Sequence, residues 1–93
     1  MGTAVSPDGR ELYVATGRGN KVAVIDTTKN EVVAMIPVGN RVWCIALSPD
    51  GSRLYTANGA SNDVSVIDLK ERKELTRIKV GDGPWGVAIA PRP

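Results

Sequence analysis

The fold of this chain is decided by residues 38–51, which read Val38-Gly39-Asn40-Arg41-Val42-Trp43-Cys44-Ile45-Ala46-Leu47-Ser48-Pro49-Asp50-Gly51. The last part of this stretch recurs as Ala4-Val5-Ser6-Pro7-Asp8-Gly9, and the first part recurs as Val80-Gly81-Asp82-Gly83-Pro84-Trp85. The offset is always 42 residues, as from Ser6 to Ser48 and from Trp43 to Trp85. Aligning residues 6–47 with 48–89 gives 18 identities in 42 positions without a gap. An internal repeat with a period near forty and strand-like content indicates β-propeller blades.

Each repeat unit contains four short segments rich in β-forming residues, separated by clusters of Gly, Pro, Asn and Asp. The expected strands are residues 3–6, 11–16, 21–26 and 31–38 in the first unit, and 41–47, 53–57, 63–68 and 73–80 in the second. We therefore expect an all-β fold with two four-stranded propeller blades, blade 1 at about 3–39 and blade 2 at about 40–81.

The strands of the two units differ in polarity. Residues 41–47 are apolar at nearly every position, which is typical of a strand buried on both faces. The fourth strand of blade 1 is apolar enough at Val32, Val33, Met35 and Ile36 to lie on a neighbour. Its counterpart at 73–80 mixes Lys, Glu and Arg with apolar residues, as expected at the solvent edge of a sheet.

Composition excludes several classes of function. The 93 residues include one cysteine and no histidine, so this chain cannot assemble an intramolecular disulfide, a Ser-His-Asp triad or histidine-ligated zinc. Twelve Lys and Arg against ten Asp and Glu give a net charge of +2 without a basic run, which indicates no nucleic-acid partner. No apolar run approaches the roughly 18 residues of a membrane span, so we expect no membrane insertion. We expect no cofactor and no enzymatic activity.

The chain begins in the middle of a repeat unit, which suggests that it was cut from a longer parent whose export signal would have been lost. The compartment is therefore left open. The first strand, at residues 3–6, lacks its beginning, while residues 84–90 supply an extra copy of the innermost strand. This extra strand of one molecule could occupy the truncated position in the next, which predicts head-to-tail closure into a ring.

Three copies would give six blades and four copies would give eight, so we expect a homotrimer or a homotetramer. The alternative is a fragment of a longer propeller that does not assemble and aggregates through its exposed faces.

Propeller ligands generally bind at the mouth of the central channel, on loops that precede the innermost strand or join the second and third strands. A small polar or anionic ligand, or a metal held by oxygen atoms, could bind there. The alternative is that the Asn, Gly and Asp residues serve turn geometry and that the Trp side chains pack between blades. The candidate ligand-binding residues are Arg18, Asn40, Arg41, Trp43, Asn62, Asp82 and Trp85, with Asn20, Asn58, Ser61 and Asp63 in the same loops.

Four other aspartates recur at matching positions in both units. Asp8 and Asp50 lie in the turns, and Asp26 and Asp68 end the third strands. Their repetition favours bonding to turn amides over paired catalytic carboxylates. Cys44, on a strand expected to be buried, is interpreted as a small core residue and not as a nucleophile.

Several motifs resemble the YVTN-type β-propeller repeats of surface-layer proteins and of relatives of quinoprotein amine dehydrogenase heavy chains and lactonase-like propellers. They are Leu12-Tyr13-Val14-Ala15, Val24-Ile25-Asp26-Thr27, Ile36-Pro37-Val38-Gly39, Ser48-Pro49-Asp50-Gly51, Val66-Ile67-Asp68 and Gly83-Pro84-Trp85-Gly86-Val87-Ala88. The resemblance covers essentially the whole chain and implies the propeller fold. These motifs are turns and packing positions, so they carry little information about activity.

The sequence thus predicts a non-enzymatic, self-assembling propeller module that serves as a scaffold or a binding platform, with an unidentified ligand. The alternative function is a fragment of a propeller enzyme of the lactonase-like or quinoprotein type, because the resemblance includes both. Carboxylates gathered at the channel mouth would favour that alternative.

Overall fold

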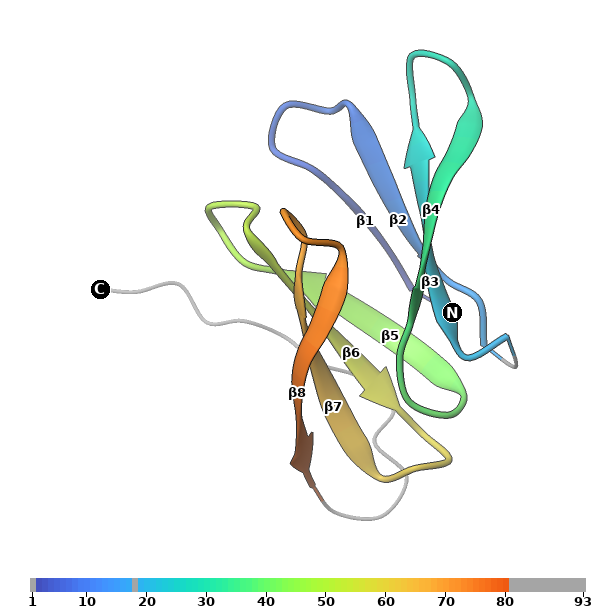
Figure 1. Cartoon of the computed structure of the whole chain (residues 1–93), viewed down its shortest axis with the longest axis vertical. Coiled ribbons are helices and arrows are strands. Elements are labelled where there is room, and N and C mark those ends of the chain that lie inside the picture. Colours follow the sequence, from blue (N-terminus) through green and yellow to red (C-terminus); the bar gives the residue numbers. More distant parts are fainter. Residues whose placement is uncertain (1, 18, 81–93) are drawn as a thin grey trace.

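A computed structural model describes residues 2–17 and 19–80, which form two four-stranded antiparallel sheets without a helix (Figure 1). The strands are β1 (Thr3–Val5), β2 (Glu11–Ala15), β3 (Lys21–Asp26), β4 (Glu31–Pro37), β5 (Val42–Leu47), β6 (Arg53–Asn58), β7 (Asp63–Asp68) and β8 (Lys73–Lys79). The first four strands make blade 1 and the last four make blade 2, each in the order of the sequence. The predicted all-β fold of two four-stranded blades is confirmed.

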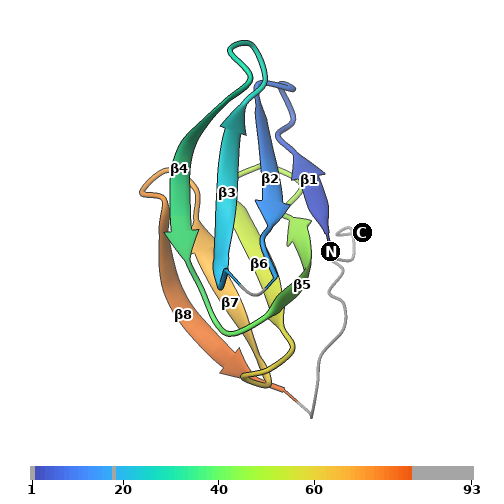
Figure 2. The ribbon, with the colours of Figure 1, turned by 90° about the vertical axis from the view of Figure 1, so that its right-hand side faces the viewer.

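Register and irregularities repeat together with the sequence. Val14 pairs with Ala23 in blade 1, and Thr56 pairs with Ser65 at the matching place in blade 2. Both sheets also shift register at the same point of the third strand, between Val24 and Ile25 in blade 1 and between the equivalent residues of blade 2. Figure 2 shows the two sheets with their strands in the same order, so that β1 and β5 lie on one side and β4 and β8 on the other.

The Ser-Pro-Asp-Gly turns bend the chain between the first and second strands of each blade. Asp50 Oδ1 accepts hydrogen bonds from Ser48 Oγ at 2.7 Å and from the Ser52 amide at 3.0 Å. Asp8 makes the equivalent bonds in blade 1. The glycine that closes each turn has a positive φ, 75° at Gly9, which favours glycine because it has no Cβ.

A second pair of turns joins the third and fourth strands. Asp26 Oδ1 accepts from the amides of Thr28 and Lys29 at 2.9 and 3.2 Å. Asp68 Oδ1 accepts from the amide of Lys70 at 2.9 Å. The prediction that the four repeated aspartates bond turn amides is confirmed.

The hydrophobic core lies between the blades. Blade 1 presents alternating residues of its strands to blade 2, since strand side chains point to opposite faces in turn. These residues are Tyr13, Ala15, Val22, Val24 and Ile36, and they pack with Ile45, Leu54 and Ile67 of blade 2. Fully burying a valine, leucine or isoleucine stabilises a fold by about 1.5–3 kcal/mol, so the blades hold one another in place.

The other face of each sheet points away from this core. The outer face of blade 1 consists of Thr3, Val5, Leu12, Val14, Ala23, Ile25, Val32 and Met35, as the strand registers place them. The outer face of blade 2 contains Tyr55, Ala57, Val64, Val66 and Ile78. Large apolar side chains are exposed on both faces, including Val5 at 54%, Val32 at 57% and Ile78 at 52%.

Two predictions about burial need correction within the described chain. On β4, Ile36 is buried, but Val32, Val33 and Met35 are exposed because they do not point into the core. On β5, Val42 and Ile45 are buried, while Trp43 and Cys44 are only half-buried. The reason is that each sheet packs against only one other sheet among residues 2–17 and 19–80. The polar fourth strand of blade 2 is exposed along almost its whole length, as expected.

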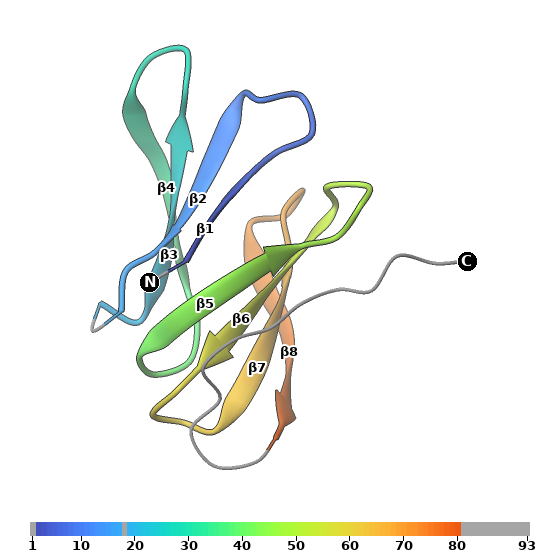
Figure 3. The same cartoon turned by 180° about the vertical axis from the view of Figure 1, so that it is seen from behind.

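The innermost strands of the two blades lie next to each other (Figure 3). A Cβ added to Gly2 would come within 2.9 Å of the Ile45 amide nitrogen and 3.1 Å of the Cys44 Cα. Glycine therefore permits a close approach of the two backbones at this point. β1 has three residues and β5 has six.

Candidate functional site

The predicted channel-mouth loops lie together at one end of the molecule, the lower end in Figure 1. The Arg41 amide donates to Asn20 Oδ1 at 2.9 Å, and the Asn40 amide donates to Ser61 Oγ at 3.1 Å. The Gly59 amide in turn donates to the Arg41 carbonyl at 2.8 Å. The loops β2–β3, β4–β5 and β6–β7 are thus bonded to one another.

Three residues other than glycine have a positive φ in the described part of these loops. The values are 56° for Asn20, 53° for Arg41 and 58° for Asn62. Asparagine tolerates this region better than most residues, whereas for arginine it is uncommon. The exposed Asn40 and Arg41 are the predicted site residues on the β4–β5 loop, and their amides are committed to holding the loops together.

Trp43 takes part in packing at the same end. A Cβ added to Gly59 would lie 1.9 Å from the Trp43 Nε1 and 2.0 Å from its Cδ1. The indole therefore rests on the backbone of the β6–β7 loop, where only glycine leaves enough room. This contact lies within blade 2, so packing of Trp43 between blades stays a prediction. The remaining predicted site residues, Arg18, Asp82 and Trp85, and the predicted extra strand at 84–90 lie outside the described residues.

A buried polar network lies behind these loops in blade 2. Asn58 Nδ2 donates to Asp63 Oδ1 and to Ser65 Oγ, both at 2.8 Å, and Asn58 Oδ1 accepts from Thr56 Oγ1 at 2.9 Å. All four residues are at most 5% exposed. Ser61 Oγ also donates to Asp63 Oδ1 at 2.8 Å, which links the network to the β6–β7 loop.

This network continues outward along the sheet. Ser65 Oγ donates to Glu74, whose carboxylate also accepts from Arg77 Nε at 2.8 Å. Buried polar groups stabilise a fold when all of their partners are present, and here they are paired with each other. Asn58 and Asp63 are thus buried and bonded to each other inside blade 2.

The sequence contains a signal for this network that our sequence analysis did not use. The residues of blade 1 at the matching positions are Val14, Thr16, Lys21, Ala23 and Val32, and most of them cannot make such bonds. A difference between repeats at five positions of one sheet face indicates that this face is stabilised differently in the two blades. Only the fold shows that these positions lie together.

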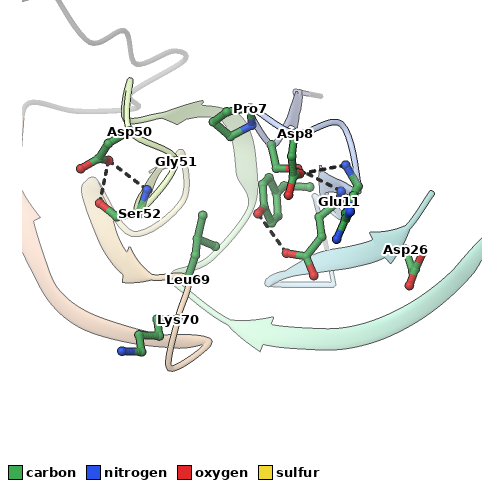
Figure 4. Close-up of a pocket in the computed structure, with 12 residues that line it drawn as sticks. Pro7, Asp8, Glu11, Asp26, Asp50, Gly51, Ser52, Leu69 and Lys70 are labelled. Carbon is green, nitrogen blue, oxygen red and sulfur yellow. Dashed lines mark hydrogen bonds between the residues drawn. The ribbon is translucent and has the colours of Figure 1, made fainter. Parts of the chain in front are cut away.

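A pocket of about 560 Å³ lies at the opposite end of the molecule, between the Ser-Pro-Asp-Gly turns of the two blades (Figure 4). Our sequence analysis placed no candidate site there. Blade 1 contributes carboxylates and Tyr13, and blade 2 contributes its turn and Leu69. The lining residues are Ser6, Pro7, Asp8, Arg10, Glu11, Tyr13, Asp26, Asp50, Gly51, Ser52, Leu69 and Lys70.

The family model that matches this chain is described as "YNCE-like beta-propeller", and it covers residues 3–92. The chain belongs to the YNCE-like β-propeller family. This membership confirms the propeller resemblance that the motifs indicated, over almost the whole chain. The YVTN type of repeat stays a prediction.

Solved structures similar to this YNCE-like chain include hydrazine synthase from Kuenenia stuttgartiensis, with a TM-score of 0.93 and 36% sequence identity over 97% of the chain. Two structures of AztD from Citrobacter koseri have TM-scores of 0.80 and 0.79 at 21% identity, which supports the fold alone. The YNCE-like chain spans only 25–26% of the length of these proteins. A search of curated proteins gave no match.

Charge in the pocket of this YNCE-like chain is fixed by the turns. Backbone and side-chain hydrogen bonds from Ser52, with a further bond from Ser48, lower the pKa of Asp50 to about 2. The bond from the Ser6 hydroxyl lowers the pKa of Asp8 in the same way. A hydrogen bond stabilises the charged form of a carboxylate that accepts it, so both groups stay ionised at neutral pH.

Tyr13 and Glu11 form the wall of the pocket on blade 1. Burial raises the pKa of Tyr13 to about 12, and the hydrogen bond to Glu11 adds to this shift. Glu11 also forms a 2.6 Å ion pair with Arg72 of blade 2. General acid–base catalysis works best with a pKa near the working pH, and the shifts of Asp8, Asp50 and Tyr13 all lead away from neutrality. At neutral pH, Asp8 and Asp50 of this pocket are therefore charged and Tyr13 is neutral.

Metal binding finds no support in the described part of the YNCE-like chain. Within residues 2–17 and 19–80, no three His, Cys, Asp or Glu side chains are grouped so that they could hold a metal ion. The same residues include no helix suited to crossing a bilayer. Cys44 is half-buried, with its Sγ 3.8 Å from the Ile45 carbonyl oxygen.

Proposed function

We propose that this chain is a non-enzymatic β-propeller module that assembles with copies of itself and serves as a scaffold or a binding platform. One observation carries the proposal. The outer face of each blade carries large apolar residues at the positions where the other blade uses them to form the buried core between the blades.

Blade 2 supports this proposal through identity of residues. The five residues with which blade 1 packs on blade 2, Tyr13, Ala15, Val22, Val24 and Ile36, recur unchanged on the outer face of blade 2 as Tyr55, Ala57, Val64, Val66 and Ile78. Ala57 and Val66 are already buried, but Ile78 is 52% exposed where Ile36 is fully buried. The outer face of blade 2 therefore has the residues that stack on another blade.

Blade 1 offers the complementary surface. Leu12 and Ile25 on its outer face match Leu54 and Ile67, which are fully buried against blade 1 in the core. Val5, Val32 and Met35 on the same face are 54%, 57% and 46% exposed. An exposed apolar sheet face of this kind marks a site of association. A second copy would cover the outer face of this blade 1 with its own blade 2, and the remaining outer faces would be covered when further copies close a ring.

Head-to-tail contacts of this kind close into a ring when the rotation divides a full turn. Two blades per copy allow a trimer with six blades or a tetramer with eight. Residues 86–91, Gly-Val-Ala-Ile-Ala-Pro, closely match residues 2–7, Gly-Thr-Ala-Val-Ser-Pro. This similarity supports the exchange of the 84–90 segment between copies, where it would take the place of the three-residue β1. In the ring, Asn40 and Arg41 of every copy would surround the channel mouth, where a small polar or anionic ligand is proposed to bind.

The mass of the protein in solution tests this proposal. Light scattering after size exclusion is expected to show a discrete trimer or tetramer, and removing residues 84–93 is expected to abolish it. A complex with a micromolar dissociation constant is almost fully assembled at about 100 times that concentration. If the protein stays a folded single chain up to that concentration, the proposal is contradicted.

A second candidate function is a segment of a larger propeller enzyme. The 36% identity and TM-score of 0.93 to part of hydrazine synthase favour it. In that case the outer faces would be covered by further blades of one chain. Turnover of lactones or amines by the isolated chain, or saturable metal binding in a titration, would favour an enzymatic function. Inactivity together with a discrete ring would favour the scaffold.

A further inference from the structure

The two Ser-Pro-Asp-Gly turns touch each other across the junction between the blades. A Cβ added to Gly51 would lie 2.7 Å from Cδ and 2.8 Å from Cγ of Pro7, so the proline ring rests against the glycine (Figure 4). Gly51 has a φ of 76°. This contact defines the register in which blade 2 packs against blade 1.

The residues that correspond to this contact one repeat away lie at the outer faces of the two blades. Pro49 is the counterpart of Pro7, and Gly9 is the counterpart of Gly51, each 42 residues apart. Gly9 has nearly the same φ, 75°, but a Cβ added there would meet no atom of residues 2–17 and 19–80 within 4 Å. Gly9 thus has the same turn as Gly51 and an open space where a proline ring lies in the other blade.

We infer that the proposed self-assembly uses the register of the chain's own blade junction, so that Pro49 of one copy rests against Gly9 of the next. This inference depends on the proposed function. The occupant of the outer face of blade 1 is then a second copy of this chain, because its blade 2 continues the stack that β1–β8 begin.

The joint between copies differs in chemistry from the junction within the chain. The ion pair of Glu11 with Arg72 has Arg53 and Asn30 as its counterparts, so it has no equivalent between copies. The polar residues of blade 2 that face blade 1, including Ser65 and Glu74, are replaced by alanine and valine on the outer face of blade 1. Apolar contact and the fit of the turns therefore set the register between copies, since neither the ion pair nor the polar network recurs there.

A matched pair of glycine substitutions tests the contact. Gly9→Ala and Gly51→Ala impose the same backbone strain because the two φ angles are nearly equal. Gly51→Ala also collides with Pro7 and is expected to lower the thermal stability of the chain itself. Gly9→Ala has no collision within the chain, so it is expected to weaken association by about tenfold or more through a collision with the neighbour's Pro49.

Truncating the proline on the other side provides the rescue. Adding Pro49→Ala to Gly9→Ala is expected to restore the association constant to within about threefold of the Pro49→Ala single variant, measured by sedimentation equilibrium. If Gly9→Ala associates like the wild type, or if Pro49→Ala gives no rescue, the register is wrong while the assembly stands. If the wild type is a single chain, the proposed function and this register both fall.

A second comparison applies if circular dichroism shows that Gly9→Ala does not fold. Val32 lies on the outer face of blade 1, and its counterpart Glu74 is half-buried at the junction within the chain. Val33 matches Leu75, which is 45% exposed although blade 2 packs on blade 1. Val32→Lys is therefore expected to weaken association by about tenfold or more, and Val33→Lys by less than about twofold. Equal effects of the two substitutions would overturn the register.

Discussion

Glu11 of β2 and Arg72 of the β7–β8 turn form a 2.6 Å ion pair that joins blade 1 to blade 2. The arginine adopts a φ of 56°, in the left-handed region, and its Nη1 is buried without a hydrogen-bond partner among the residues that the structure describes. Removing Glu11 would therefore leave the Arg72 guanidinium at the edge of the core without its carboxylate. This arrangement makes the pair a contact between blades whose strength can be measured.

We predict that Glu11→Gln destabilises the chain by about 0.5–1 kcal/mol, because both side chains are about one-third exposed and solvent screens the attraction. Urea denaturation of the two single variants and the double variant Glu11→Gln/Arg72→Met gives the coupling energy. A coupling energy near zero would show that the pair does not hold the blades together. Lys29→Met, in a turn exposed to solvent, is the control for loss of a charge.

Asn58 is predicted to be a critical residue of blade 2. Asn58→Ala removes three buried hydrogen bonds, to Thr56, Asp63 and Ser65. Asp63 keeps its bond from Ser61 and Ser65 keeps its bond to Glu74, so the main loss is at Thr56, and an unsatisfied buried group costs about 1–3 kcal/mol. Thr16→Ala, at the matching position of blade 1, is the control, because its hydroxyl bonds the Lys21 backbone in a less buried place. Thermal unfolding is expected to show the larger decrease for Asn58→Ala. Equal decreases would mean that the network adds nothing beyond a single bond.

Gly39 is predicted to accept no side chain. A Cβ there would lie 2.4 Å from Asn58 Nδ2 and 2.7 Å from Ser61 Oγ, both of which belong to the buried network. Gly39→Ala is expected to lower stability by about 1–3 kcal/mol, as overpacking a well-packed site does. Chemical denaturation measures the change in the free energy of unfolding. When Asn58 is also replaced by alanine, its smaller side chain leaves room for the new Cβ, so Gly39→Ala is expected to cost less stability in that background. If Gly39→Ala costs the same in both backgrounds, the collision with Asn58 is not its cause.

Acid is predicted to weaken the fold only at low pH. The pKa values of Asp8, Asp26 and Asp50 are lowered by hydrogen bonds from their turns, and that of Asp50 falls to about 2. A depressed pKa in the folded state gives stability that is present above the unfolded value, near 4, and is lost as the pH falls towards the folded value. Urea midpoints are thus expected to stay level from pH 8 to 5 and to decrease between about pH 4 and pH 2.

Asp50→Asn tests the origin of this decrease. The variant is expected to lose part of the acid-dependent change in stability, because its amide does not titrate. An unchanged decrease below pH 4 would assign the acid sensitivity to other carboxylates.

Much of the fold could be predicted from the repeat. The 42-residue period and the turns that punctuate it fix the strand order, because hydrogen bonding between neighbouring strands and turn geometry are local properties. The aspartates could be interpreted correctly for the same reason, since each bonds amides two or three residues away. Local chemistry recurs with the sequence that encodes it.

Packing between blades could not be predicted in the same way. The sequence alone does not show that Val32 is exposed while Ile36 is buried four residues later, because the face that meets a neighbour depends on which sheet stacks on which. The pocket between the Ser-Pro-Asp-Gly turns was missed because it is formed by two turns of different blades, and neither turn is unusual by itself.

By itself the sequence determined the two blades, their strands and their turns, since these follow from alternation and from contacts within a few residues. Only the tertiary structure decided which face of each sheet is buried, where the charged pocket lies, and that Asn58 and Asp63 are bonded inside blade 2. The physical reason is that burial and pairing across blades depend on contacts between residues far apart in the chain. A repeat pattern places apolar residues on both faces of a sheet and does not show which face meets a neighbour.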